Sequence, residues 1–153
     1  MQDLESATNL VIRPAREGDR PAWNRLWNAY LEFYGTGRPR SQFDLTWRRI
    51  MDSEESMYSC LAFSGDACLG LVNFLYHRSF WDDSDRCYLQ DLYVDPKARG
   101  QGIGAKLIAA VGHHAEAAQS SGVYWLTAED NDRARRLYDH VAVLTPFIRY
   151  NLP

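Results

Sequence analysis

The stretch Arg99-Gly100-Gln101-Gly102-Ile103-Gly104 decides the fold, because it is a basic, glycine-rich turn between a predicted strand and a predicted helix. The strand covers residues 87–94 and ends before Asp95-Pro96, and the helix covers residues 103–121. Unpaired N–H groups and the dipole at the N-terminus of a helix favour anions. Glycines let the backbone approach a ligand closely because they lack a Cβ. The turn is therefore a candidate phosphate-binding site, to which Arg99 adds positive charge.

Two other phosphate-binding motifs fit this turn less well. A P-loop requires Gly-Lys-Ser/Thr, whereas Gly104 is followed here by Ala105-Lys106-Leu107. Residues 100–105 match the dinucleotide-binding pattern G-x-G-x-x-A as a string. That motif, however, opens a parallel βαβ unit with an acidic residue roughly 20 positions further on, at the end of the next strand. The next predicted strand ends at Thr127-Ala128, and an antiparallel-looking meander precedes the turn, so this motif is disfavoured.

Hydrophobic periodicity predicts the elements on either side of the turn. Aromatic and apolar residues recur at 3-and-4 spacing in a first helix, for which Asp19 is the predicted N-cap. Ser41 and Asp44 form a capping-box-like start for a second helix. Strands are predicted at residues 9–13, 58–63, 68–76, 123–127 and 147–151, a loop at 77–86 and a short helix at 132–140. One α+β domain over residues 1–153, without linker or repeat, is the expected architecture.

Composition limits the partners and the location of the chain. It has 46% hydrophobic and 24% charged residues, as an ordinary globular domain does, and its net charge of -3 comes without the basic stripe of a nucleic-acid binder. No secretory signal and no window of membrane-spanning length is visible. Cys60, Cys68 and Cys87 indicate free thiols of a reducing compartment, without the spacing of a metal site. We therefore expect a cytoplasmic protein with no nucleic-acid, membrane or metal partner.

Three separated blocks of sequence resemble a known family. The pattern Arg99-x-x-Gly102-x-Gly104, directly after residues 92–96, resembles the acetyl-CoA signature of the GNAT N-acetyltransferase superfamily. Residues 89–94, 124–129 and 131–138 resemble in particular the branch of the yeast histone, polyamine and D-amino-acid acetyltransferases, and more distantly the spermidine/spermine acetyltransferases. The resemblance implies the GNAT fold, a central mixed, mostly antiparallel twisted sheet that is flanked by about four helices and splayed at its central strands.

The resemblance also implies a site for acetyl-CoA. Backbone groups of Leu92, Tyr93 and Val94 are expected to pair with the pantetheine arm, with the Val94 N–H on the thioester oxygen; the alternative is an ordinary strand that is paired throughout. Residues of the turn are expected to hold the pyrophosphate, namely Arg99, Gly100, Gln101, Gly102, Ile103, Gly104 and Ala105. Asn131 is expected to hydrogen-bond the coenzyme arm.

Two residues are candidates for acid and base. Tyr138 corresponds to the tyrosine that acts as general acid, and a phenol with a pKa near 10 can protonate a departing thiolate, whose thiol has a pKa of about 8.5; the alternative is a helix tyrosine packed in the core. Related enzymes that use a glutamate base would place it near position 88, where this chain has Tyr88, so Glu32 and Glu129 are the remaining glutamate candidates. Asp91 matches an acid of the polyamine branch. It either draws the proton of the amine through water or attracts the ammonium group; the alternative is a structural strand aspartate that bonds a nearby loop.

The acceptor is expected between the first two helices and the loop before the central strand. The candidates are Trp27, Tyr30, Glu32 and Tyr34 on one side, Phe80, Trp81, Asp82 and Asp83 on the other, and Asp91. Acids beside aromatic rings suit an ammonium ion through charge and cation–π contacts. The helix aromatics also have the spacing of core residues, and the loop acids are equally typical of a solvated turn.

These residues predict an acetyl-CoA-dependent N-acetyltransferase that acts by direct attack on a primary amine of a small molecule, either a polyamine or an amino acid. Alternatives are a protein-lysine or peptide N-terminal acetyltransferase and a non-catalytic acyl-CoA-binding module. Residues 141–144 read Val-Ala-Val-Leu where the family often has Gly-Phe or Gly-Tyr, which leaves the pairing of the last strand open, including pairing with a second subunit. Homodimerisation is common in this branch and is expected here.

Overall fold

A computed structural model describes residues 9–153, which form one five-stranded sheet with four α-helices. The strands are β1 (Leu10–Pro14), β2 (Met57–Ser64), β3 (Ala67–His77), β4 (Arg86–Val94) and β5 (Val123–Tyr124), in that spatial order. The helices are α1 (Arg20–Phe33), α2 (Arg40–Met51), α3 (Ile103–Ala117) and α4 (Asp132–Val141). Neighbouring strands are antiparallel except for β4 and β5, which are parallel. The expected mixed, mostly antiparallel sheet with four helices is confirmed.

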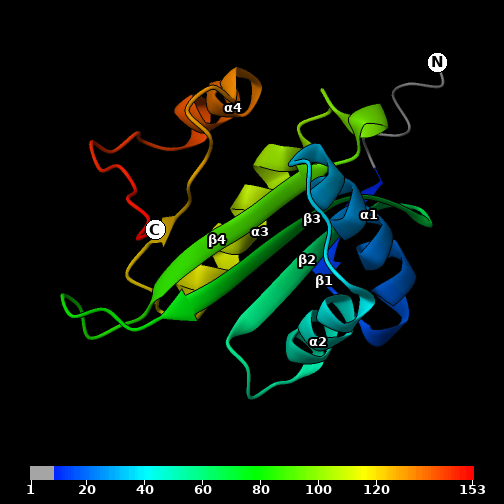
Figure 1. The fold of residues 1–153 in the computed structure, drawn as a ribbon, viewed down its shortest axis with the longest axis horizontal. Helices are drawn as coiled ribbons and strands as arrows, with labels where there is room; N and C mark the ends of the chain where they lie inside the picture. Colours follow the sequence, from blue (N-terminus) through cyan, green and yellow to red (C-terminus); the bar gives the residue numbers. More distant parts are fainter. Residues whose placement is uncertain (1–8) are drawn as a thin grey trace.

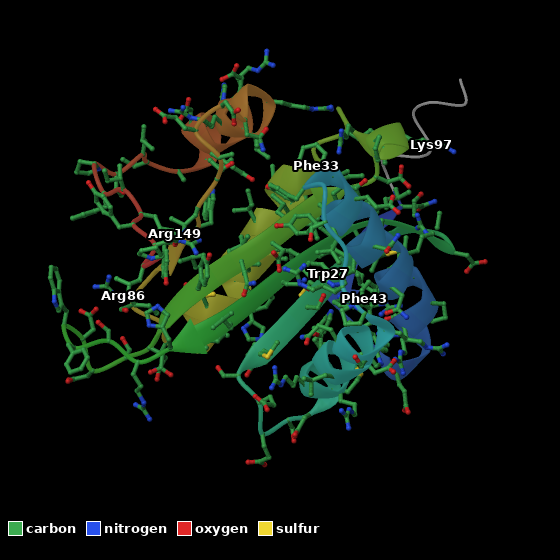
Figure 2. All side chains as sticks on the ribbon, in the orientation of Figure 1. Trp27, Phe33, Phe43, Arg86, Lys97 and Arg149 are labelled. Atoms are coloured by element: carbon green, nitrogen blue, oxygen red, sulfur yellow. The ribbon has the colours of Figure 1, made fainter. Side chains whose placement is uncertain are left out.

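The helices cover the sheet on both faces. In Figure 1, α1 and α2 lie on one face and α3 lies on the other. The α1–α2 face has a core of Trp23, Leu26, Trp47, Leu61, Cys68, Leu71 and Tyr93. The α3 face has a core that includes Val72, Phe74, Cys87, Leu89, Leu107 and Val111. Arg86, the first residue of β4, and Lys97, which follows β4, mark opposite ends of the sheet in Figure 2.

The sheet is splayed between β4 and β5. The two strands pair only at Cys87↔Val123 and Tyr88↔Tyr124, so the C-terminal half of β4 has no partner on this side within residues 9–153. Beyond β5 the chain leaves the sheet and forms α4, which stands apart from the sheet beside β4 (Figure 1). The expected splay is confirmed, and it opens a space between β4 and α4.

A bulge in β4 determines which side chains face this space. Asn73 is opposite Asp91 and Phe74 is opposite Leu89, so Gln90 is an extra residue in β4. Side chains of a strand point alternately to the two faces of the sheet, and a bulge shifts this alternation by one residue. Before the bulge, Leu89 packs on the α3 face; after it, Asp91 lines a cavity on the α1–α2 face. The bulge therefore moves Asp91 to the opposite face from the one that simple alternation predicts.

Several predicted element boundaries are corrected by the structure. Residues 147–151 do not form a strand, and β5 is limited to two residues. Asp19 does not cap α1 through its side chain, because its carboxylate accepts hydrogen bonds from Arg13 instead. The capping box of Ser41 and Asp44 does not form either: α2 begins at Arg40, and Asp44 pairs with Arg20.

Residues 1–8 lie outside the described part of the chain. They belong to the segment in which the sequence analysis expects no secretory signal, so that expectation stays a prediction. The single domain over residues 1–153 likewise stays a prediction. Within residues 9–153, none of the helices combines the length and apolar character that a membrane span requires.

Candidate functional site

Two cavities meet at the C-terminal end of α1. The first, the glycine-turn cavity, has a volume of about 580 Å³ and lies between β4, the glycine turn and α4. The second, the aspartate cavity, has a volume of about 440 Å³ and lies between α1, α2 and the middle of β3 and β4. Tyr30 and Tyr34 line both cavities. The two cavities are therefore adjacent at these two tyrosines.

The glycine turn presents open backbone at the start of α3. Gly100 and Gly102 have φ angles of +81° and +76°, a left-handed conformation that glycine adopts without strain. A Cβ added at either position would meet nothing within 4 Å, so the backbone is accessible. Arg99 donates from Nε to the Val94 carbonyl at 3.2 Å, which fixes its side chain at the end of β4. The turn thus combines helix N–H groups with positive charge, the chemistry that binds a pyrophosphate.

The walls of the glycine-turn cavity come from β4 and α4. Leu92, Tyr93 and Val94 line it where β4 has no β5 partner. From α4 the cavity is lined by Asn131, Arg133, Ala134, Leu137 and Tyr138. Asn131 is the N-cap of α4 and accepts a hydrogen bond from the Ala134 N–H at 3.4 Å. Among the residues predicted to hold the coenzyme, Gln101 does not line this cavity.

Tyr138 of α4 is one of the residues that line this cavity. Its ring packs edge-on against Trp125, with ring centroids 5.4 Å apart. Burial, together with the neighbouring Tyr34, raises the pKa of the Tyr138 phenol above its ordinary value. The phenol therefore stays protonated at neutral pH and is able to donate a proton.

The aspartate cavity has a buried carboxylate in its wall. Asp91 is only 8% exposed and accepts a hydrogen bond from the Asn73 side-chain amide at 3.3 Å. Trp23 in turn donates from Nε1 to Asn73 at 3.4 Å and to the Ser59 hydroxyl at 3.1 Å. Burial raises the pKa of Asp91, and hydrogen bonding from Tyr30 and Asn73 opposes this rise. A carboxylate with a raised pKa is a stronger base than an exposed one.

Tyr30 connects this carboxylate to the junction of the cavities. Its ring stacks on Trp27 at 5.1 Å and meets the Tyr34 ring edge-on at 5.0 Å between centroids. Burial, and then the neighbouring Asp91 carboxylate, raise the pKa of Tyr30 far above its ordinary value. Tyr30 is therefore a permanent hydrogen-bond donor beside Asp91.

The structure does not bring every predicted acceptor residue to this site. Glu32, Trp81 and Asp82 line neither cavity. Glu32 accepts a hydrogen bond from Asn28 on the exposed side of α1, and Asp82 pairs with Arg86 at 3.1 Å. Trp81 is 86% exposed in the loop before β4. Helix periodicity and a projecting loop place these three side chains away from the two cavities, and their role in acceptor binding stays a prediction.

Tyr34, a sequence candidate for the acceptor side, lines both cavities and meets the Tyr30 ring edge-on. Several polar lining residues were missed from the sequence. Among them, Asn73, Arg38 and Arg49 carried no local signal, because their position depends on how β3, the α1–α2 connection and α2 pack around Asp91.

A model of the acetyltransferase (GNAT) family matches residues 23–142, a range that includes both cavities. The chain belongs to the GNAT family. This GNAT chain is 35% identical over 144 residues to the D-amino-acid N-acetyltransferase HPA3 of Saccharomyces cerevisiae. The aligned region covers 92% of this chain and 89% of that protein. It is 29% identical over 138 residues to the thialysine N-epsilon-acetyltransferase of Bos taurus, with 84% and 81% of the two chains covered.

Solved structures support the same fold. The aminoglycoside N-acetyltransferase AAC(6')-Iy in complex with CoA superposes on this GNAT chain with a TM-score of 0.82 at 17% identity, over 94% of each chain. As a member of the family, the chain is an acetyl-CoA-dependent N-acetyltransferase. The glycine-turn cavity suits that coenzyme, because open backbone at Gly100 and Gly102 and the basic side chains of Arg99 and Arg133 border it.

Proposed function

We propose that this GNAT chain moves the acetyl group of acetyl-CoA to a primary amine of a small molecule, an amino acid or a polyamine, by direct attack. The observation that carries the proposal is the meeting of two cavities at Tyr30 and Tyr34. The glycine-turn cavity contains a neutral phenol, Tyr138, and the aspartate cavity contains a buried carboxylate, Asp91. An acid and a base on opposite sides of one junction suit acyl transfer between a thioester and an amine.

The coenzyme is proposed to bind with its pyrophosphate on the glycine turn and its pantetheine arm along β4. Backbone N–H groups at residues 100–105 and the Arg99 guanidinium bind the pyrophosphate. Residues Leu92, Tyr93 and Val94 have no β5 partner, so backbone groups on that side of β4 are available to the arm, and the Val94 N–H polarises the thioester carbonyl. Asn131 reaches the arm through its side-chain NH₂, since its oxygen caps α4.

The proton balance assigns one role to each residue. An ammonium acceptor gives a proton to Asp91, and the resulting neutral amine attacks the thioester carbon. The C–N bond forms, the C–S bond breaks, and Tyr138 gives its phenolic proton to the departing thiolate. The second amine proton restores the phenol, and the proton on Asp91 leaves to water. Tyr30 holds the carboxylate in place and keeps the amine at the junction.

The shape of the aspartate cavity favours a small acceptor over a protein. Its volume of about 440 Å³ is typical of a small-molecule site, and aromatic side chains form much of its wall. A peptide or protein acceptor is the second candidate.

Measuring free thiol released from acetyl-CoA tests this proposal. The acceptors are a set of polyamines, L- and D-amino acids and a lysine peptide, with product identified by mass spectrometry. Release with a small amine and an acetylated product supports the proposal. Release with the peptide alone supports the second candidate, and binding of acetyl-CoA without release for any of these acceptors would contradict both.

The C-terminal segment supports a homodimer as part of the proposal. After α4 the chain forms no strand, and its apolar side chains are 73–97% exposed: Val143, Leu144, Phe147, Ile148, Tyr150 and Leu152. Exposed apolar clusters of this kind mark interaction surfaces. Figure 2 shows Arg149 of this segment on the β5 side of the molecule, where the sheet ends. A second copy of this chain is the proposed partner.

The cytoplasm is the proposed location. Cys60, Cys68 and Cys87 are all free and buried, as expected in a reducing compartment. Burial raises the pKa of Cys60 and of Cys87 to about 11, so these thiols stay protonated and unreactive.

A further inference from the structure

The aspartate cavity contains an asymmetric set of charges. Three charged residues line it: Asp91, which is buried, and Arg38 and Arg49, which are exposed. A ligand with one cationic and one anionic group would match this set. A polyamine, which is cationic at both ends, would place its distal ammonium near two guanidinium groups.

The two arginines come from different elements. Arg38 lies in the connection between α1 and α2, where its Nη1 donates to the Thr36 hydroxyl at 2.9 Å and to the Gly37 carbonyl at 2.8 Å. These bonds hold the guanidinium at the cavity, because Thr36 also lines it. Arg49 lies in the last turn of α2 and forms none of the ion pairs found among residues 9–153. Its charge is therefore available to a ligand.

Helix α2 turns a polar stripe toward the cavity. Gln42, Thr46 and Arg49 follow at i, i+4 and i+7 and line the cavity together. The Gln42 side chain donates to the Thr46 hydroxyl at 3.2 Å, so the stripe is ordered up to the turn that carries Arg49. The opposite stripe of α2 contributes Trp47 to the core. A polar stripe that faces an aromatic cavity indicates a ligand with a polar group on that side.

We infer that the acceptor is an amino acid, whose amine is placed at Asp91 and whose carboxylate is bound by Arg49 and Arg38. This inference rests on the proposed acetyl transfer and specifies its substrate class. Two guanidinium groups are suited to a carboxylate because they donate several hydrogen bonds in a fixed plane. The aromatic wall formed by Trp27, Tyr30 and Tyr58 then contacts the side chain of the amino acid.

The test compares acceptors that share an amine and differ in the carboxylate. Amino acids of both configurations are assayed beside their carboxamides and beside diamines of the same length, as kcat/KM for thiol release. The wild type is expected to prefer the acid over its amide by roughly 10- to 100-fold, the effect of charge-assisted hydrogen bonds. Equal values for acid, amide and diamine would overturn the inference while leaving the acetyl transfer intact.

Variants assign the preference to named residues. Arg49→Gln is expected to raise KM for the acid by roughly 10- to 100-fold and to leave the amide unchanged. Arg49→Glu is expected to shift the preference toward diamines. Arg48→Gln is the control, because Arg48 is exposed on α2 and lines neither cavity. Equal losses in Arg49→Gln for acid and amide would contradict carboxylate binding.

A binding measurement separates this inference from the proposed function. Calorimetric titration of the wild type and of Arg49→Gln with an amino acid and its amide, in the presence of CoA, requires no turnover. Selective binding of the acid, lost in Arg49→Gln, supports the inference even if no thiol is released. No selectivity for the acid in this titration would contradict it.

Discussion

The side-chain amide of Asn73 donates a hydrogen bond to the Asp91 carboxylate at 3.3 Å, and the two residues are cross-strand partners at the bulge between β3 and β4. Hydrogen bonds to the charged form of a carboxyl lower its pKa. Asn73→Ala is therefore expected to raise the pKa of Asp91 further. Because Asp91 accepts a proton only when it is ionised, the acidic limb of the kcat/KM profile should move to higher pH.

A pH profile of thiol release from about pH 5 to 9, a span that brackets the range in which perturbed carboxyl groups titrate, checks this shift. Asn28→Ala is the control, since Asn28 bonds Glu32 on the exposed side of α1. An acidic limb at the same pH in Asn73→Ala and wild type would exclude Asp91 as the titrating base.

Asp91→Asn is expected to lower activity and raise stability at neutral pH. Burial raises the pKa of this carboxyl above its ordinary value of 3.8, so ionising it costs folding free energy. This cost is absent below the pKa that Asp91 has in the unfolded chain. It grows as pH rises through the higher pKa that Asp91 has in the folded protein. Replacing the base should reduce kcat by about 10²- to 10⁴-fold.

Thermal unfolding across pH tests the stability part of this expectation. The melting temperature of Asp91→Asn should exceed that of the wild type at pH 7, and the difference should vanish toward acid pH. A difference that does not depend on pH, or a variant as active as the wild type, would contradict the assignment.

Alternation in β4 shows why the position of Asp91 could not be predicted from sequence. Cys87 and Leu89 alternate in the sequence as the residues of a regular strand do, and Asp91 would continue on their face. The extra residue Gln90 places it on the other face. No residue type marks this bulge, because it depends on the pairing with β3.

Other parts of the site were accessible from the sequence. Glycine spacing predicted the turn before α3, and the resemblance predicted the place of Tyr138 on α4. The ion pair of Asp82 also had a local signal, since Arg86 follows it at i+4. The two arginines of the aspartate cavity had none, because the packing of α2 on the sheet brings them there.

Gly102→Ala is expected to destabilise the protein and weaken coenzyme binding. Its φ of +76° is unfavourable for a residue with a Cβ and costs about 1–2 kcal/mol. Relaxation of the turn would also move the N–H groups at the start of α3. Urea unfolding and calorimetric titration with CoA measure the two effects.

Gly112→Ala is the matched control within the same helix. A Cβ at Gly112 meets nothing within 4 Å, and alanine favours a helix by about 1 kcal/mol over glycine. This variant should be more stable than wild type and bind CoA equally well. Equal effects of both substitutions on CoA binding would contradict a specific role for the turn.

Phe147→Ser with Ile148→Ser is expected to convert a dimer into a monomer. Both side chains are exposed in the single chain, at 84% and 77%, and association would bury them. Sedimentation velocity measures the oligomeric state. Phe80→Ser is the control, because Phe80 is fully exposed in the loop before β4. A wild type that sediments as a monomer would exclude the proposed homodimer.

The most direct test of the account is thiol release from acetyl-CoA by Tyr138→Phe, measured at saturating acceptor beside the wild type. Phenylalanine keeps the ring that packs on Trp125 and removes the proton that the thiolate receives. The account predicts a kcat lower by about 10²- to 10⁴-fold, with an unchanged KM for acetyl-CoA. A kcat equal to that of the wild type would contradict Tyr138 as the general acid.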